Sequence, residues 1–361
     1  MNKNDSEIMA GILTNECNYV EIEKPDIADV LIFNTCAIRN KAEQRAFSRI
    51  REFNAIRKKN KTNQLLILAG CIPQYEKENI FKDFPYLDLV IGTNTLEFLP
   101  QFLNNDQDKQ TINIQESKDT KHTSKQILRN SRNQAWIPIT YGCNNFCTYC
   151  IVPHTRGREV SQKKEEILNE IAALKNSKYK EIVLLGQNVN SYGAGLYTDY
   201  DFADLLADVH AFDFLDKIDF LTSHPKDISL KLIKTISKLP RIGREIHFPI
   251  QAGDDEILKR MNRGYTSNDY KKLVQLIREW IPDAKISTDL IVGFPGETDE
   301  QFQNTIKVVK DLGFSRINTA AYSPRKGTAA AEMKDQISDK LKHERLLILQ
   351  ETVQKYAFNK D

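Results

Sequence analysis

The sequence predicts an α/β protein with two parts: a doubly wound parallel sheet, followed by an open, incomplete barrel of six βα units. Two observations carry this prediction. Short apolar runs alternate with helical patterns in both parts of the chain, which is typical of parallel sheets. A polar stretch at 105–135 separates the two series. With 361 residues, 40% of them hydrophobic and 28% charged, the chain is long enough for two cores and has the composition of an ordinary soluble protein.

Residues 1–104 are expected to form the first domain. Residues 5–13 are weakly amphipathic, and helical patterns return at 41–59 and from about Thr95. Between them lie three short apolar runs that read as buried parallel strands, at 29–34, 65–69 and 88–91.

Two cysteines of this domain, Cys36 and Cys71, each follow the end of a predicted strand. Because the carboxyl ends of parallel strands share one edge, and ligands bind there, the two thiols are expected to lie together and to share a metal. The alternative is a pair of buried cysteines in strand-end turns. Cys17 has no motif around it and is expected to be incidental.

The segment 105–135 is predicted to be a flexible linker, because it is rich in Ser, Lys, Asn and Gln. Its basic side chains are expected to form a solvated tether, with contacts to RNA phosphates as the alternative. Across the whole chain the formal net charge is only +2, so any nucleic-acid site must be a local patch.

Residues 136–330 are expected to form the second domain. Each of its strand-like runs is followed by helical sequence, as in a barrel whose chemistry lies at the carboxyl ends of the strands. The six runs are 136–141, 181–185, 217–222, 245–250, 285–292 and 316–322.

Cysteines, polar residues or glycines follow the first five of these runs, which places candidate ligands at one edge of the barrel. His224 and His247 are interpreted as hydrogen-bonded strand-end histidines and are left out of the chemistry. After the cysteines that follow the first run, the segments are Gly186–Asn190, Thr222–Pro225, Pro249–Gly253, and, for the fifth run, Ser287–Asp289 with Gly293–Glu297.

The three cysteines after the first run are Cys143, Cys147 and Cys150. Three thiolates can hold three irons of a 4Fe–4S cube and leave the fourth iron open to a small molecule. A zinc site would need a fourth ligand and favours a second cysteine pair, which is not visible. A disulfide loop does not suit a chain without a secretory signal. The spacing therefore favours an iron–sulfur cluster.

The motif Cys-x-x-x-Cys-x-x-Cys, with an aromatic residue before the last cysteine, resembles the radical S-adenosylmethionine (SAM) superfamily. The longer string at 141–160 resembles the methylthiotransferases of that superfamily. The resemblance implies a partial barrel of radical SAM type, a 4Fe–4S cluster on the three cysteines, and SAM bound to the open iron. It also implies that SAM is cleaved to a 5'-deoxyadenosyl radical.

The same resemblance suggests residues that bind SAM. The family region matching Gly186 and Gln187 helps to hold the SAM amino group, and the region matching 291–297 flanks its adenine. Tyr149 is expected to pack on that adenine. The full set of expected cofactor-binding residues is Tyr149, Gly186, Gln187, Gln251, Asp289 and Gly293. Arg156 and Arg158 are expected either to contact substrate phosphates or the SAM carboxylate, or to form structural ion pairs.

Two further stretches, 34–43 and 69–74, resemble those that hold the auxiliary cluster of methylthiotransferases. Cys36 and Cys71 are therefore expected to bind a second 4Fe–4S cluster. By the family pattern, its third ligand and the first strand of the sheet would lie upstream of Met1, so the chain is expected to lack both. Truncation is the preferred explanation, and the number of clusters, one or two, stays open.

The stretch 185–193 resembles the branch that adds a methylthio group to C2 of isopentenyladenosine at position 37 of tRNA. The resemblance implies that SAM serves both as methyl donor and as radical source. The sister branches act on threonylcarbamoyladenosine in tRNA or on an aspartate of a ribosomal protein. A truncated, non-catalytic product that keeps one cluster is the alternative of another class. A cobalamin-dependent methyltransferase is disfavoured, because residues 1–105 contain no histidine.

Residues 331–361 are expected to be a C-terminal helical segment, with one helix over 338–361, and the RNA-binding TRAM domain of the family is expected to be absent. The implied partners are the anticodon stem-loop of tRNA and an electron donor such as flavodoxin or ferredoxin, with the sulfur source unknown. No signal peptide or apolar run long enough to span a bilayer is visible. A cytoplasmic monomer that does not bind membranes is expected.

Overall fold

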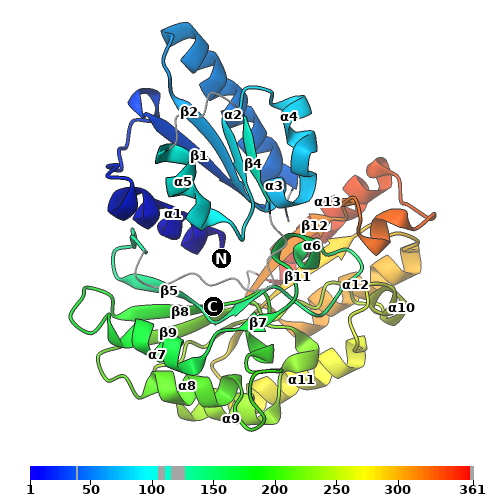
Figure 1. The fold of residues 1–361 in the computed structure, drawn as a ribbon. Helices are drawn as coiled ribbons and strands as arrows, with labels where there is room; N and C mark the ends of the chain where they lie inside the picture. Colours follow the sequence, from blue (N-terminus) through cyan, green and yellow to red (C-terminus); the bar gives the residue numbers. More distant parts are fainter. Residues whose placement is uncertain (38–39, 105–109, 115–126, 358–361) are drawn as a thin grey trace. The chain divides into compact units, whose positions relative to one another are not determined.

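The fold is described from a computed structural model that covers residues 1–37, 40–104, 110–114 and 127–357 (Figure 1). The chain divides into two compact units, which are described separately here. The N-terminal unit holds residues 1–132, 141–143 and 151–160, and the C-terminal unit holds 133–140, 144–150 and 161–361. The predicted domain boundaries stay predictions. The structure adds that 151–160 pack with the N-terminal unit.

The N-terminal unit is built on a four-stranded parallel sheet whose strands follow one another in chain order (Figure 1). Val30 pairs with Leu65, and Thr35 pairs with Gly70, so the first two strands end level with each other. The strands are β1 (Val30–Thr35), β2 (Leu65–Gly70), β3 (Leu89–Ile91) and β4 (Thr111–Asn113).

Helices cover both faces of this sheet, as a doubly wound fold requires. Because side chains alternate along a strand, Leu66 and Leu68 pack with Phe53 of α2 on one face, while Ile67 packs with Ile8 of α1 on the other. The helices are α1 (Asn2–Glu16), η1 (Pro25–Ile27), α2 (Asn40–Asn60), α3 (Cys71–Glu76), η2 (Lys77–Asn79), α4 (Ile80–Asp83), η3 (Leu96–Phe98), α5 (Leu99–Asn104) and α6 (Val152–Arg156).

Strand β4 lies inside the segment that the sequence predicted to be a linker. It pairs in parallel with β3, Leu89 with Thr111. Farther on, the N–H of Leu128 donates to the carbonyl of Glu7 in α1, at 3.0 Å. The structure differs from the prediction here because the edge of β3 pairs with this short segment, and Ile112 packs against the apolar cluster on one face of the sheet. Residues 105–109 and 115–126 of the predicted linker lie outside the described ranges.

The C-terminal unit contains the six predicted βα strands, in two parallel sheets of order β5-β8-β9 and β10-β11-β12. An isolated parallel bridge, Ile218 with Ile242, links β9 to the residues before β10. The strands are β5 (Gln134–Pro138), β8 (Glu181–Leu185), β9 (Lys217–Leu221), β10 (Glu245–His247), β11 (Lys285–Val292) and β12 (Arg316–Ala321). Strands β6 (Thr140–Tyr141) and β7 (Val160–Ser161) form a separate two-stranded sheet.

The helices of this unit pack against the strands through apolar faces. In α12, Thr298 and Gln301 form a capping box, Gly313 ends the helix in the left-handed region at φ 54°, and Phe302 and Ile306 point into the core. Ser338 caps α13, which ends at Tyr356, and residues 358–361 of the predicted helical segment lie outside the described ranges. The helices are α7 (Lys164–Ala172), η5 (Val189–Ser191), α8 (Phe202–His210), η6 (Pro225–Asp227), α9 (Leu230–Lys238), α10 (Asp255–Arg260), α11 (Ser267–Trp280), α12 (Asp299–Leu312), η7 (Ala329–Glu332) and α13 (Asp339–Tyr356).

The predicted fold class is confirmed: a doubly wound parallel sheet and an open half-barrel of six βα units. In Figure 1, helices α7, α8, α9 and α11 lie along one side of the C-terminal unit's strands. Within the ranges that the structure covers, none of the helices is both long and apolar enough to cross a membrane.

Candidate functional site

Residues 144–150, the part of the candidate ligand loop that belongs to the C-terminal unit, are held by hydrogen bonds. Thr148 donates its N–H to the carbonyl of Met261 at 3.1 Å and its hydroxyl to that of Arg260 at 2.8 Å. The side chain of Asn262 donates to the carbonyl of Phe146 at 3.1 Å, where Phe146 has a positive φ of 47°. The N–H of Cys150 donates to the carbonyl of Cys147 at 2.9 Å. The chain after α10 therefore fixes the loop's conformation.

The state of the cysteines bears on the disulfide and zinc alternatives. No cysteine forms a disulfide, and all six lie within the described ranges. Over those same ranges, no group of three or more His, Cys, Asp or Glu side chains is placed to hold one metal ion, which gives the zinc alternative no support. Each cysteine of a 4Fe–4S cube binds a different iron, so its ligands need not converge on one point.

Cys147 is buried beside Arg263, a residue that sequence reasoning missed. The Nη1 group of Arg263 donates to Cys147 Sγ at 3.2 Å and to the hydroxyl of Tyr149 at 3.3 Å. Its Nη2 donates to the carbonyl of Pro249 at 2.8 Å, and its Nε to Tyr265 Oη at 2.9 Å. Only 4% of Arg263 is exposed. A buried cation with a fixed orientation therefore faces one of the three candidate sulfur ligands.

His224 is the second polar neighbour of Cys147. Its Nε2 lies 4.0 Å from the sulfur, and its Nδ1 accepts the N–H of Lys226 at 3.3 Å. Burial, with Arg263 and Lys226 nearby, lowers the pKa of His224 to about 2. The imidazole is therefore neutral, and the bond at Nδ1 assigns its proton to Nε2. The sequence placed His224 at a strand end but outside the chemistry; the structure places it against a candidate ligand.

Unpaired polar atoms gather at the carboxyl ends of the strands of this unit. Four buried oxygens there have no hydrogen-bond partner among the described residues: Thr140 Oγ1, Gln187 Oε1, Ser223 Oγ and Gln251 Oε1. Buried polar atoms are normally paired, since leaving one unpaired costs roughly 1–3 kcal/mol. Oxygen acceptors of this kind fit a ligand with N–H donors, such as the amino groups of SAM.

Two of the predicted cofactor residues adopt the left-handed conformation. Gln251, at the end of the fourth strand run, has φ 76°, and the backbone holds it there because its N–H donates to the carbonyl of Asp289 and its carbonyl accepts the N–H of Ile291, both at 2.9 Å. Such strain in a non-glycine residue is typical of ligand sites. Gly293 has φ 70°, and a Cβ there would lie 2.5 Å from Cγ of the buried Lys342.

Gly186 is constrained by close packing, whereas Asp289 is held by hydrogen bonds. A Cβ on Gly186 would lie 2.2 Å from Thr140 Oγ1, so this strand end admits only glycine without a shift. Asp289 accepts from Asn318 at 2.8 Å and lies 3.2 Å from Nε2 of His247, whose Nδ1 is 3.0 Å from Ser287 Oγ. The structure therefore ties the Asp289 carboxylate to protein partners, which sequence reasoning had not considered.

In the N-terminal unit, Cys36 and Cys71 follow the paired residues Thr35 and Gly70, so the prediction that they share one sheet edge is confirmed. Burial raises the pKa of the Cys71 thiol, an effect that a hydrogen bond from Arg156 opposes. Burial outweighs the opposing charge of Arg156, so without a metal these surroundings keep the Cys71 thiol protonated.

Arg156 is itself buried and forms an ion pair with Asp5 of α1, so the structure favours the structural interpretation of this arginine. Gly142, before the first cysteine of the loop, has φ 69°, and a Cβ there would lie 2.1 Å from the carbonyl oxygen of Arg158. The chain therefore packs closely against itself on both sides of the ligand loop in this unit.

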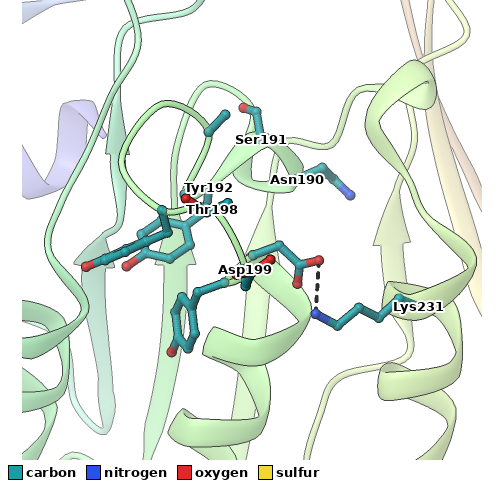
Figure 2. A pocket seen from close by; sticks show the side chains of 11 residues that line it. Asn190, Ser191, Tyr192, Thr198, Asp199 and Lys231 are labelled. Carbon is teal, nitrogen blue, oxygen red and sulfur yellow. Dashed lines mark ion pairs between the residues drawn. The ribbon is translucent and has the colours of Figure 1, made fainter.

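A cavity of about 420 Å³ lies on the long loop after β8, outside the residues that the sequence predicted (Figure 2). Its wall includes Asn190, whose amide oxygen and nitrogen are buried and have no partner among the described residues. Lys231 lies opposite, at 3.2 Å from the carboxylate of Asp201 (Figure 2). The same loop begins at Gly186 and Gln187, so it joins this cavity to the predicted SAM contacts.

Two family models match the chain. The model described as the radical SAM superfamily matches residues 137–309, and the one described as uncharacterized protein family UPF0004 matches residues 1–92.

Curated relatives match the chain over nearly its whole length. The tRNA-2-methylthio-N(6)-dimethylallyladenosine synthase of Clostridium botulinum (strain Loch Maree / Type A3) is 43% identical, over 100% of this chain and 81% of its own length. The synthase of that name from Thermoanaerobacter pseudethanolicus is 45% identical, over 100% and 77%. That of Dictyoglomus thermophilum is 44% identical, over 93% and 76%.

Solved structures of low identity share the fold. The radical SAM methyltransferase TsrM from Kitasatospora setae, with cobalamin and a [4Fe-4S] cluster bound, has a TM-score of 0.59 at 13% identity, over 80% of this chain and 62% of its own. The cobalamin-dependent radical SAM enzyme OxsB, with aqua-cobalamin bound, has a TM-score of 0.53 at 15% identity, over 98% and 50%. At such identities the likeness concerns the fold alone.

Proposed function

The chain belongs to the tRNA-2-methylthio-N(6)-dimethylallyladenosine synthase family of radical SAM enzymes, and we propose that it adds a methylthio group to C2 of isopentenyladenosine at position 37 of tRNA. The observation that carries this proposal is identity of 43–45% to synthases of that name over the full length of the chain. SAM is both the methyl donor and the radical source in this reaction.

Cys143, Cys147 and Cys150 are the proposed ligands of the radical SAM cluster. The order of the loop supports this role, since Thr148 and Asn262 fix its backbone before any metal arrives. A cluster held by these cysteines would supply the electron for the cleavage of SAM that the reaction at C2 requires.

The proposed SAM contacts are residues at the carboxyl ends of the barrel strands. The unpaired oxygens of Gln187 and Gln251 are suited to accept N–H groups of SAM, and the glycines at 186 and 293 let the ligand approach the backbone. Tyr149 is proposed to pack on the adenine. Asp289 is assigned a positioning role, because its carboxylate is bonded to Asn318 and His247 rather than left unpaired.

Cys36 and Cys71 are the proposed protein ligands of the auxiliary cluster, which relays the sulfur. Their common sheet edge supports this assignment. Iron and sulfide analysis after anaerobic reconstitution tests it: two cubes give about eight irons per chain, and one gives about four. Four irons would favour the alternative of a non-catalytic product with one cluster.

The proposed cellular setting follows from this chemistry. The partner is the anticodon stem-loop of a tRNA, and the electron comes from a small donor such as flavodoxin or ferredoxin. We propose that the enzyme acts in the cytoplasm, as a monomer and without a membrane.

Nucleoside mass spectrometry of tRNA tests the reaction. A strain that lacks this gene should accumulate isopentenyladenosine, and the gene supplied on a plasmid should restore its 2-methylthio derivative. A methylthio group on threonylcarbamoyladenosine would instead assign the chain to the sister branch, and no change in any tRNA nucleoside would contradict the proposal.

The substitution Cys147→Ala tests the cluster assignment in the purified protein. Formation of 5'-deoxyadenosine from SAM under dithionite should be lost, because the cube then lacks a ligand. Cys17→Ala is the matched control and should keep the activity, since Cys17 lies in no motif. Undiminished 5'-deoxyadenosine from Cys147→Ala would contradict the assignment.

A further inference from the structure

The surroundings of Cys147 differ from those of an ordinary buried thiol. Arg263 donates to its sulfur at 3.2 Å from a side chain that is 4% exposed. The guanidinium cannot lose its proton near neutral pH, so it is a permanent positive charge at this sulfur. Water does not screen the interaction, because both partners are buried.

The orientation of this cation is set by three other contacts. Pro249 offers a carbonyl to Nη2, and Tyr265 and Tyr149 offer hydroxyl oxygens to Nε and Nη1. Tyr265 is in turn fixed, since its own hydroxyl donates to the carbonyl of Ile250 at 2.9 Å. The N–H that faces the sulfur is therefore positioned before a ligand binds, and little orientational freedom is lost when the sulfur becomes charged.

No ion pair explains the burial of Arg263. Among the described residues, the side chain of Arg263 donates no hydrogen bond to an Asp or Glu carboxylate; its acceptors are a carbonyl, two phenol oxygens and the thiol sulfur. Burying an uncompensated cation is unfavourable. A negative group at Cys147 would supply the missing charge, and a cluster with thiolate ligands is such a group.

We propose that Arg263 is a positioning residue that raises the reduction potential of the cluster on Cys147 by stabilising its reduced form. The cluster gains one electron and no proton on reduction, so its charge becomes more negative by one. A charged N–H donor at a ligand sulfur lowers the energy of the reduced state more than that of the oxidised state. His224, whose Nε2 lies farther from the sulfur at 4.0 Å, contributes less. The inference rests on the proposed function only in requiring a cluster on Cys147.

Potentiometric titration of the reconstituted full-length protein, followed by EPR, tests the proposal. The signal to follow is the one that changes when SAM is added, because that cluster has the open iron. Arg263→Met should shift the reduction equilibrium at least tenfold toward the oxidised form, a fall of about 59 mV for one electron. Arg263→Lys keeps the positive charge but loses the planar guanidinium with its fixed N–H donors. It should therefore show a smaller shift in the same direction.

Arg278→Met is the matched control. Arg278 lies in the same unit and donates to two backbone carbonyls, those of Leu312 and Gly313, instead of to a cysteine. Arg278→Met should leave the reduction equilibrium constant of the cluster within twofold of the wild-type value. The proposal is wrong if Arg263→Met and Arg263→Lys bind as much iron as the wild type and their reduction equilibrium constants also stay within twofold of the wild-type value.

A measurement on the wild-type protein keeps the proposal testable if the variants fail to fold. Protein labelled with [15N]arginine should show a weak 15N coupling on the SAM-sensitive signal in pulsed EPR. Absence of that coupling would refute the contact. Neither experiment uses tRNA, so the two proposals are tested independently. A negative nucleoside assay would contradict the proposed function but not the role of Arg263. A positive nucleoside assay would not outweigh a negative result in the EPR experiments.

Discussion

Replacing Arg345 with methionine tests whether the turn that follows β11 depends on α13. The Arg345 side chain is 4% exposed and that of Glu297 is fully buried. Nη1 of Arg345 donates both to the Glu297 carbonyl and to its carboxylate, at 2.8 Å each. The same carboxylate accepts the N–H of Gly293 at 2.7 Å. One arginine of the terminal helix therefore stabilises the turn that carries a proposed SAM contact.

The expected loss of stability follows from the burial of the pair. Removing one partner of a buried ion pair costs about 3–5 kcal/mol, because the other charge stays buried. The bond to Asp299 adds little, since that carboxylate is 89% exposed. At roughly 2–4 °C per kcal/mol for a unit of this size, Arg345→Met should lower Tm by roughly 6–20 °C at neutral pH.

The effect should depend on pH. Burial raises the pKa of the Glu297 carboxyl, and Arg345 opposes that rise, so the substitution raises the pKa further. A carboxyl whose pKa is higher in the folded state than in the unfolded state favours folding when protonated. That contribution is complete below the unfolded pKa of about 4.3 and is lost as pH rises through the folded pKa. The loss of stability in Arg345→Met should therefore be larger at pH 8 than at pH 5.

Calorimetry of the wild type and variants at the two pH values measures this. The double variant Arg345→Met, Glu297→Gln should be more stable at pH 8 than Arg345→Met alone, because no buried charge remains. Lys271→Met is the control: its ion pair with Asp311, at 3.8 Å, is partly exposed, and the loss should stay below about 1 kcal/mol. A loss of under about 1 kcal/mol in Arg345→Met, or one that is equal at both pH values, would refute the reasoning.

Three further predictions concern the two proposed sites. Asp5→Ala leaves Arg156 buried without its carboxylate and should destabilise the N-terminal unit by about 3–5 kcal/mol in urea unfolding, whereas an effect within 1 kcal/mol would contradict the ion pair. Gln251→Gly relieves the positive φ and should keep or raise stability by up to about 1 kcal/mol, yet weaken SAM binding about tenfold in calorimetric titration; unchanged affinity would contradict the assigned contact. Gly142→Ala forces a Cβ against the carbonyl of Arg158 and should lower the iron content of reconstituted protein, a result that full iron occupancy would exclude.

The fold could be predicted from the sequence because most of its strands coincide with short apolar runs. The apolar run at 65–69 became β2, and the run at 285–292 became β11, with bounds that agree within a residue. The fourth strand of the N-terminal sheet, Thr111–Asn113, was not accessible. It is short and polar, and its order comes from pairing with Leu89–Ile91, about twenty residues earlier.

Site residues could be predicted from the sequence only where they lie together in one short loop. Cys143, Cys147 and Cys150 are visible in the sequence because their spacing is local. Arg263 is not, because it contacts Cys147 across 116 residues and sits in a stretch that reads as an ordinary helix end. Glu297 was expected only as part of the segment 291–297 beside the SAM adenine, and its actual partner, Arg345, is 48 residues away on α13. Contacts that fold-level packing creates leave no periodic pattern to detect.

We propose that SAM binds at the carboxyl ends of the barrel strands. Several residues there lower the stability of the C-terminal unit. Thr140, Gln187, Ser223 and Gln251 leave buried oxygens unpaired, at roughly 1–3 kcal/mol each, and Gln251 adds backbone strain of about 1–3 kcal/mol. Together these costs are comparable to the whole stability of a typical domain, about 5–15 kcal/mol. A ligand that pairs with these four oxygens would recover part of that cost, so binding and folding of this unit would be thermodynamically linked.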